Sequence, residues 1–153
     1  MMIITKNPSG KIYKKLLDFA FEYCDEFQLV VRKRMGSLKK VEPVLESLEN
    51  SLLSMKEQSS WAGTWLGSGQ KAKVYKYRTD THAKKILTAA ADSFYDWQQP
   101  NLPEDLSFLK KGKPFLVCTA HENEGYFLTE SPYFIEKIMA IEGLEVHQSD
   151  ERR

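Results

Sequence analysis

Few arrangements of side chains in this chain could do chemistry, and His121 followed by Glu122 is the first to consider. The pair begins like the helical zinc motif of metalloproteases, in which a second histidine follows one helical turn later. No second histidine follows here, and a metal site built from His121, Glu122 and Glu124 would need a further ligand from another part of the chain. We therefore expect no metal and no other cofactor.

Two further motifs fail on their spacing. A phosphate-binding loop has four residues between its glycines and a lysine directly after the second, whereas Gly67 and Gly69 are separated by Ser68 alone and lie between two predicted strands. Cys118 and His121 could form a nucleophile and its base, but residues three apart on a strand point to opposite faces of the sheet. The sequence therefore favours a protein without catalytic residues, and it leaves an enzyme of unknown type open as a third possibility.

A group of acidic residues around one histidine is the first candidate for a binding surface. Loop tips held by a rigid sheet present polar groups in fixed directions. If strands at 106–109 and 115–120 pair as a hairpin, four carboxylates gather around His121, favour its protonated form and suit a basic protein partner. A solvated turn is the alternative. The residues of this candidate surface are Glu104, Asp105, His121, Glu122 and Glu124.

An aromatic and basic surface offers single-stranded nucleic acid as the alternative partner. Trp61 and Trp65 share a face of one predicted strand, and residues 71–78 are expected to form the second strand of the same hairpin. Bases could stack on the rings while the basic side chains bind phosphate. The competing interpretation places the tryptophans in the core and the tyrosines over a sheet edge. The residues of this second surface are Trp61, Tyr75, Tyr77, Lys71, Lys73 and Arg78.

The stretch 102–128 must position the acidic group, and it has the pattern of three antiparallel strands. Residues 106–109 begin with apolar and polar side chains in alternation, and residues 110–113 form a polar turn that contains glycine. Residues 115–120 are apolar at nearly every position, which is typical of a strand covered on both faces. We therefore place this strand, with Val117 buried, at the centre of a sheet, and expect residues 125–128 to return beside it.

The rest of the chain predicts helices and further strands. Apolar residues at helical spacing predict four helices, which begin near residues 8, 41, 80 and 132 and extend to about residues 26, 55, 97 and 142. Strands are expected at 28–33, 61–65 and 71–78, and the lysines of the last are typical of an exposed edge strand. With the three strands above, this order predicts a single α+β domain over residues 1–153, with a mostly antiparallel sheet of about five or six strands packed with about four helices.

Composition is consistent with one folded domain. The chain has 153 residues, of which 42% are hydrophobic and 28% charged, enough for one core. Cys24 and Cys118 have no metal-binding spacing, and no apolar run approaches the roughly 20 residues that cross a bilayer, so we expect a cytoplasmic protein without a membrane partner. Residues 1–4 are too short for a targeting segment, and we expect residues 147–153 to form a frayed tail.

Three short motifs occur together in the second half of the chain: LPEDLSF at 102–108, PFL at 114–116, and His121 with Glu122. In these motifs the chain resembles a family of small uncharacterised proteins of Gram-positive spore-forming bacteria, some of which are labelled stage III sporulation protein. The resemblance implies a cytoplasmic bacterial protein and assigns no site residue. Together with the surfaces above, it favours a non-catalytic protein-interaction module, such as an immunity or regulatory partner, and nucleic-acid binding is the alternative.

Overall fold

One antiparallel sheet of eight strands forms the centre of the structure, a computed structural model that describes residues 1–33, 36–67 and 69–150. Its strands are β1 (Met2–Ile4), β2 (Glu26–Val31), β3 (Leu52–Gln58), β6 (Ala72–Arg78), β7 (Glu104–Lys110), β8 (Lys113–Thr119), β9 (Glu124–Phe127) and β10 (Val146–Gln148). They lie in the order β10-β1-β9-β8-β7-β2-β6-β3. The remaining strands of the described residues, β4 (Ser60–Trp61) and β5 (Thr64–Trp65), form a separate hairpin.

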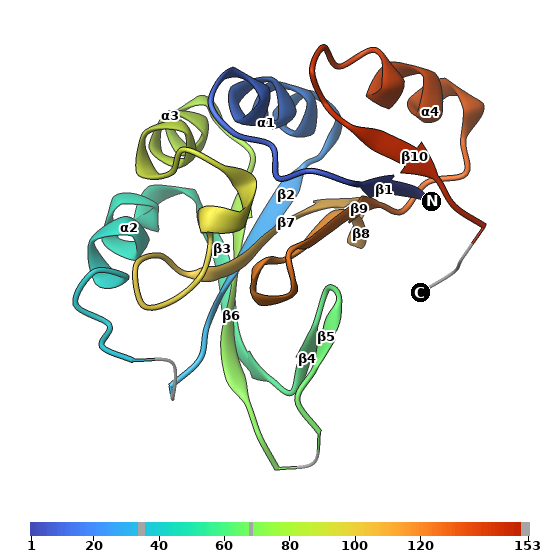
Figure 1. Cartoon of the computed structure of the whole chain (residues 1–153). Helices are drawn as coiled ribbons and strands as arrows, with labels where there is room; N and C mark the ends of the chain where they lie inside the picture. Colours follow the sequence, from blue (N-terminus) through green and yellow to red (C-terminus); the bar gives the residue numbers. More distant parts are fainter. Residues whose placement is uncertain (34–35, 68, 151–153) are drawn as a thin grey trace.

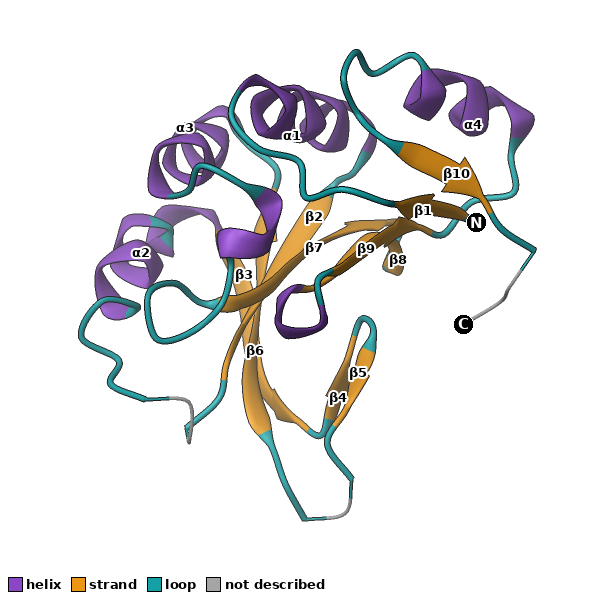
Figure 2. Ribbon diagram, viewed as in Figure 1, coloured by secondary structure: helices purple, strands orange, loops and turns teal. Residues whose placement is uncertain are grey.

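The helices and the β4–β5 hairpin lie on opposite faces of the large sheet (Figure 1). The helices are α1 (Lys11–Tyr23), α2 (Glu42–Ser47), α3 (Thr81–Ala90) and α4 (Pro132–Met139). Because successive strand residues point to opposite faces, β2 sends Phe27 and Leu29 into the large core beneath the helices and Val30 into a smaller cluster with Trp61 of the hairpin. Figure 2 shows the hairpin alone on its side of the sheet.

The predicted meander is confirmed. β7, β8 and β9 pair in sequence order, and β8 is the fourth strand of the eight, with Val117 fully buried. The last helix is also confirmed, because α4 begins with Pro132 directly after Ser131. Both predictions rested on patterns within a few neighbouring residues, where turn chemistry and apolar spacing agree.

The prediction of five or six strands is wrong, because β1, β3 and β10 were missed. Residues 1–4 were considered only as a targeting segment and rejected as too short, but they contain β1, which lies between β9 and β10 and buries Met2. Leu52 and Met55 continue a helical spacing, yet α2 ends at Ser47 and both residues belong to β3. His147, expected in a frayed tail, pairs with Ile3 in β10. Residues 151–153 of that tail lie outside the described residues. Strands this short are defined by their partners rather than by their own periodicity.

The predicted hairpin between residues 61–65 and 71–78 is also wrong. Trp61 pairs with Thr64 around a turn at Ala62 and Gly63, so that the two tryptophans belong to one small hairpin. β6 pairs with β2 on one side and β3 on the other, and it is therefore interior rather than an edge strand. Ser68, in the turn that was expected between the two segments, lies outside the described residues.

Besides α2, helices α1 and α3 are also shorter than predicted. α1 starts at Lys11, because the side chain of Asn7 is bonded across the fold to Ser93 and Tyr95 instead of capping the helix. α3 starts after the predicted cap Asp80, whose carboxylate accepts a hydrogen bond from the Ala83 N–H, but it ends at Ala90. Of the residues that extended its predicted length, Phe94 begins a separate 3₁₀ turn, Phe94–Asp96, and Trp97 follows that turn.

Candidate functional site

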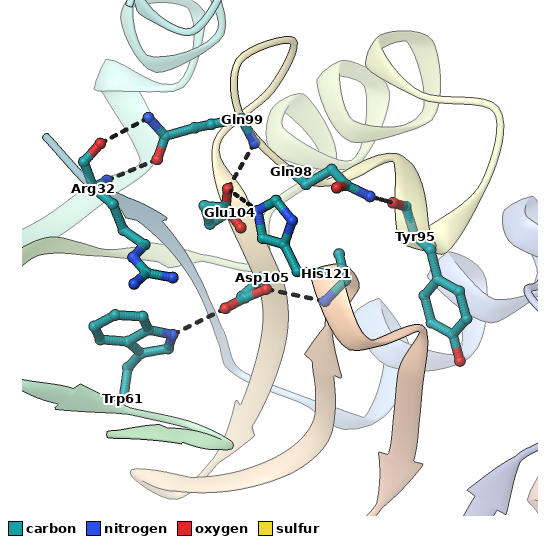
Figure 3. A network of polar contacts seen from close by, with 9 residues as sticks. Arg32, Trp61, Tyr95, Gln98, Gln99, Glu104, Asp105 and His121 are labelled. Carbon is teal, nitrogen blue, oxygen red and sulfur yellow. Dashed lines mark hydrogen bonds and ion pairs between the residues drawn. The ribbon is translucent and has the colours of Figure 1, made fainter. Parts of the chain in front are cut away.

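The first two residues of β7, Glu104 and Asp105, lie in a buried polar network rather than on a displayed surface (Figure 3). Their side chains are 0% and 3% exposed. Adjacent acids after a Leu-Pro pair resemble turn residues, but here they already belong to the strand and are covered on both sides. The expectation that they form part of an exposed acidic surface is therefore wrong.

Glu104 connects three segments of the chain. Its Oε1 accepts a hydrogen bond from the backbone N–H of Gln99 at 2.8 Å and lies 2.8 Å from Nε2 of His121. The Gln99 side chain is bonded in turn to the backbone N–H and carbonyl of Arg32, at 2.7 and 2.9 Å. The predicted closeness of the β7 start to His121 is thus confirmed, because the β7–β8 pairing brings them together. Within the described residues, Oε2 of Glu104 has no hydrogen-bond partner.

Asp105 fastens the β4–β5 hairpin to the sheet. Its Oδ2 accepts a hydrogen bond from Nε1 of Trp61, and its Oδ1 accepts one from the Ala120 N–H, both at 3.1 Å. The backbone of Asp105 is in the left-handed region, with φ at 56°. Burial raises the pKa of this carboxyl to about 6, although the two hydrogen bonds oppose that shift. The Arg32 guanidinium lies over the Trp61 ring, 5.9 Å from its centroid.

This network is suited to holding structure in place. The His121 side chain is 38% exposed, but its Nε2 already contacts Glu104. Two of the four predicted carboxylates are buried and bonded, which leaves Glu122 exposed and Glu124 half-buried at the tip. Among the described residues, no group of three or more His, Cys, Asp or Glu side chains could hold a metal ion. The network can therefore position the hairpin and the tip, and it offers no set of accessible reacting groups.

The residues of the predicted nucleic-acid surface do not come together. Tyr77 is buried and stacks on Phe27, with ring centroids 5.0 Å apart, and Tyr75 lies half-buried on the same helix-covered face. Trp61 is buried on the opposite face. Lys71 and Arg78 are exposed and Lys73 is half-buried, and the Arg78 side chain donates to the carbonyl of Asn50. The sheet itself separates the rings that would have stacked bases.

A groove of about 630 Å³ lies between the β4–β5 hairpin and the sheet, and sequence reasoning missed it. Its volume is within the usual range for ligand sites. The sheet contributes strands β2, β3, β6, β7, β8 and β9, and the hairpin covers them from the other side. The lining residues are Gln28, Gln58, Ser60, Trp61, Ala62, Gly63, Thr64, Trp65, Lys76, Leu109, Gly112, Pro114, Tyr126 and Leu128.

Trp61 and Gly63 hold the hairpin over the groove. Gly63 has a φ of 78°, and a Cβ there would lie 2.9 Å from both the Thr119 Oγ1 and the Val117 Cγ1 atoms of β8. The turn therefore packs directly on the sheet, at a distance that only glycine allows. Trp65, on the other strand of the hairpin, is 75% exposed while it lines the groove. An exposed indole on a hairpin fixed at two points is available for contact with a ligand.

Gln28 is the unusual residue of the groove floor. Its side chain is 3% exposed, and within the described residues its Nε2 has no hydrogen-bond partner. A buried amide without a partner costs stability, and such groups are rare unless a ligand or water uses them. The signal was present in the sequence, because Gln28 is the single polar residue between Phe27 and Val31.

No family model, no curated protein and no solved structure matches this chain. No helix among the described residues combines the length and apolar character needed to cross a membrane. The function has to be argued from the groove and the network themselves.

Proposed function

We propose that this protein is a non-catalytic interaction module, which holds an extended segment of a partner protein in the groove beneath the β4–β5 hairpin. The observation that carries the proposal is the buried side-chain amide of Gln28. Its Nε2 has no hydrogen-bond partner within the described residues, and Gln28 lines a groove of about 630 Å³. Leaving a buried donor unsatisfied costs about 1–3 kcal/mol, and a ligand that accepts its hydrogen bond removes that cost.

The hairpin suits an extended chain as the ligand. β4 and β5 pair only with each other within the described residues, so each has one edge that no further strand covers. An extended peptide can add to such an edge through main-chain hydrogen bonds, while its side chains enter neighbouring pockets. The exposed indole of Trp65 supplies the kind of aromatic anchor that often dominates binding energy.

The chemistry of the lining favours binding over catalysis. None of the described residues that line the groove is a histidine, a cysteine or a carboxylate, so the groove contains no evident general acid or base. Lys76 is the one charged residue among the described lining residues, whereas grooves for single-stranded nucleic acid follow the phosphates with several cations. Binding of a peptide requires neither a general acid or base nor a row of cations.

The proposal is tested by selecting a random peptide library on the purified chain and measuring the affinity of the enriched peptides for two variants. Trp65→Ala removes the exposed indole of the groove, and we expect it to weaken binding at least about tenfold. Tyr133→Ala is the matched control, because Tyr133 is an exposed aromatic residue of α4 outside the groove lining. Its affinity for the same peptides should equal that of the parent.

Two results would contradict the proposal. The first is a selection that enriches no peptide. The second is a set of peptides that bind Trp65→Ala as tightly as the parent, because the groove would then not be their site. Circular dichroism of both variants shows whether each remains folded, and little change is expected since both side chains are largely exposed.

A further inference from the structure

We infer that the groove selects its partner segment by an acidic side chain, whose carboxylate binds between the amide of Gln28 and the ammonium of Lys76. This inference rests on the proposed function and adds the chemical class of the ligand. Gln28 and Lys76 are direct cross-strand partners in the β2–β6 pairing, and both line the groove. Side chains of directly opposed residues point to the same face with Cβ atoms about 5 Å apart, so the two donors are neighbours.

Lys76 brings an unneutralised positive charge to the groove. Four described lysines have a carboxylate within 4.0 Å, for example Lys84 with Asp18 at 2.6 Å and Lys15 with Glu142 at 3.3 Å, and Lys76 is not one of them. No described carboxylate lies within 4.0 Å of the Lys76 ammonium, and the residue is half-buried. Its cross-strand neighbour on β3 is the uncharged Ser54. A ligand has to supply the negative charge that the groove lacks.

A carboxylate satisfies both groups at once when the buried Gln28 amide turns toward the groove. Its two oxygens accept several hydrogen bonds, and bonds between ionised partners are about twice as strong as neutral ones. A glutamine of the ligand could accept from Gln28 but would leave Lys76 without a counter-charge, and a lysine would repel it. The floor therefore discriminates in favour of Asp or Glu at one position of the segment.

The walls indicate which residues flank that acid. Trp65 covers one side of the groove from the hairpin, and Pro114 and Leu128 contribute apolar surface from the sheet side. Aromatic and apolar surface next to a pair of donors suits an acidic residue with apolar neighbours in an extended chain. The expected partner is accordingly a protein segment with one acid set among apolar residues.

The test uses an array of synthetic peptides in which a central Glu, Gln or Lys is flanked by varied apolar residues. The parent chain should bind the best Glu peptides at least about tenfold more tightly than their Gln counterparts, in a manner that added salt reduces. Lys76→Met should remove this preference, and Lys76→Glu should reverse it in favour of the Lys peptides. Lys56→Met is the control, because Lys56 is an exposed residue of the neighbouring strand β3 and does not line the groove.

The outcomes separate this inference from the proposed function. If Glu and Gln peptides bind equally and Trp65→Ala weakens both, the groove binds peptides but the acidic preference is overturned. If Lys76→Met weakens Glu and Gln peptides by the same factor, Lys76 acts only on the shape of the groove and the inference is again overturned. If no peptide binds, or binding is independent of Trp65, the proposed function itself fails.

Discussion

The indole N–H of Trp61 donates a 3.1 Å hydrogen bond to Oδ2 of Asp105, and this contact ties the β4–β5 hairpin to the start of β7. Both side chains are buried, so the bond is made away from water. The same carboxylate accepts a hydrogen bond from the N–H of Ala120, the first residue after β8. Asp105 thus holds the β4–β5 hairpin over the groove, and it also fixes the backbone that leads from β8 to His121.

Replacing Trp61 with Phe should loosen the hairpin. The ring remains, but Oδ2 of Asp105 loses its donor, and a buried acceptor without a partner costs about 1–3 kcal/mol of unfolding free energy. We expect that loss in urea unfolding, together with faster amide exchange in β4 and β5. Trp65→Phe is the control and should change stability by less than about 0.5 kcal/mol, because Trp65 is largely exposed. Equal stability of the two variants would show that the Trp61 bond contributes nothing.

Asp105 should make stability depend on pH in the direction opposite to that of a salt-bridged acid. Burial raises its pKa from 3.8 to about 6, the nearby Glu104 adds to the shift, and the bonds from Trp61 and Ala120 and the charge of His121 oppose it. Between these two pKa values the folded state binds more protons than the unfolded state, so the contribution of Asp105 to the free energy of unfolding decreases as pH rises through this window. The decrease amounts to roughly 3 kcal/mol.

Asp105→Asn removes this titration and isolates the effect. The unfolding free energies of parent and variant should be measured in urea from about pH 4 to about pH 7, across the window where the carboxyl loses its proton. The variant should gain stability relative to the parent as pH rises, because only the parent acquires a buried charge. If the difference in unfolding free energy between parent and variant stays constant over this pH range, the pKa of the Asp105 carboxyl is not raised by folding.

Gln28→Met should stabilise the protein while it weakens peptide binding. Methionine is similar in size to glutamine and removes the buried Nε2 that has no described partner, so we expect the free energy of unfolding to rise by about 1 kcal/mol. Gln99→Met is the matched control, because both polar atoms of the Gln99 amide are bonded to the Arg32 backbone. That variant should lose about 1–3 kcal/mol. A loss of stability in Gln28→Met as well would argue that its amide is satisfied in the folded protein.

The features that the sequence predicted correctly are those decided by neighbouring residues. Val117 lies in a run that is apolar on both faces, and such a run needs no knowledge of the rest of the fold to be placed in the interior of a sheet. Leu52 and Met55 were misassigned because their spacing fits a helix, while the partner that makes them a strand, β6, lies about twenty residues further along the chain. Local periodicity cannot resolve a choice that distant pairing decides.

The site was harder to predict than the fold for the same reason. The closeness of Glu104 to His121 followed from the predicted hairpin, but the hairpin pattern did not show that Glu104 is fully buried and bonded to the Gln99 N–H. The groove depends on where the β4–β5 hairpin docks, and only the glycine at position 63 hinted at a close approach. Gln28 was a visible irregularity in an apolar strand, yet its meaning required the space above it to be known.

Gly63 provides the sharpest test of the docked hairpin. A Cβ at this position would lie 2.9 Å from Thr119 Oγ1 and Val117 Cγ1, so Gly63→Ala should lift the turn from β8 and weaken peptide binding. Gly69→Ala is the control for backbone strain: Gly69 has a similar φ of 81°, but no atom of the described residues outside its chain neighbours lies within 4 Å of its Cβ position. Both variants incur the left-handed strain of roughly 1 kcal/mol, and only Gly63→Ala adds a clash. We therefore expect Gly63→Ala to be the less stable variant in urea and the one that loses affinity for the selected peptides. If the two variants behave alike in both measurements, the hairpin does not need its contact with β8 to form the groove.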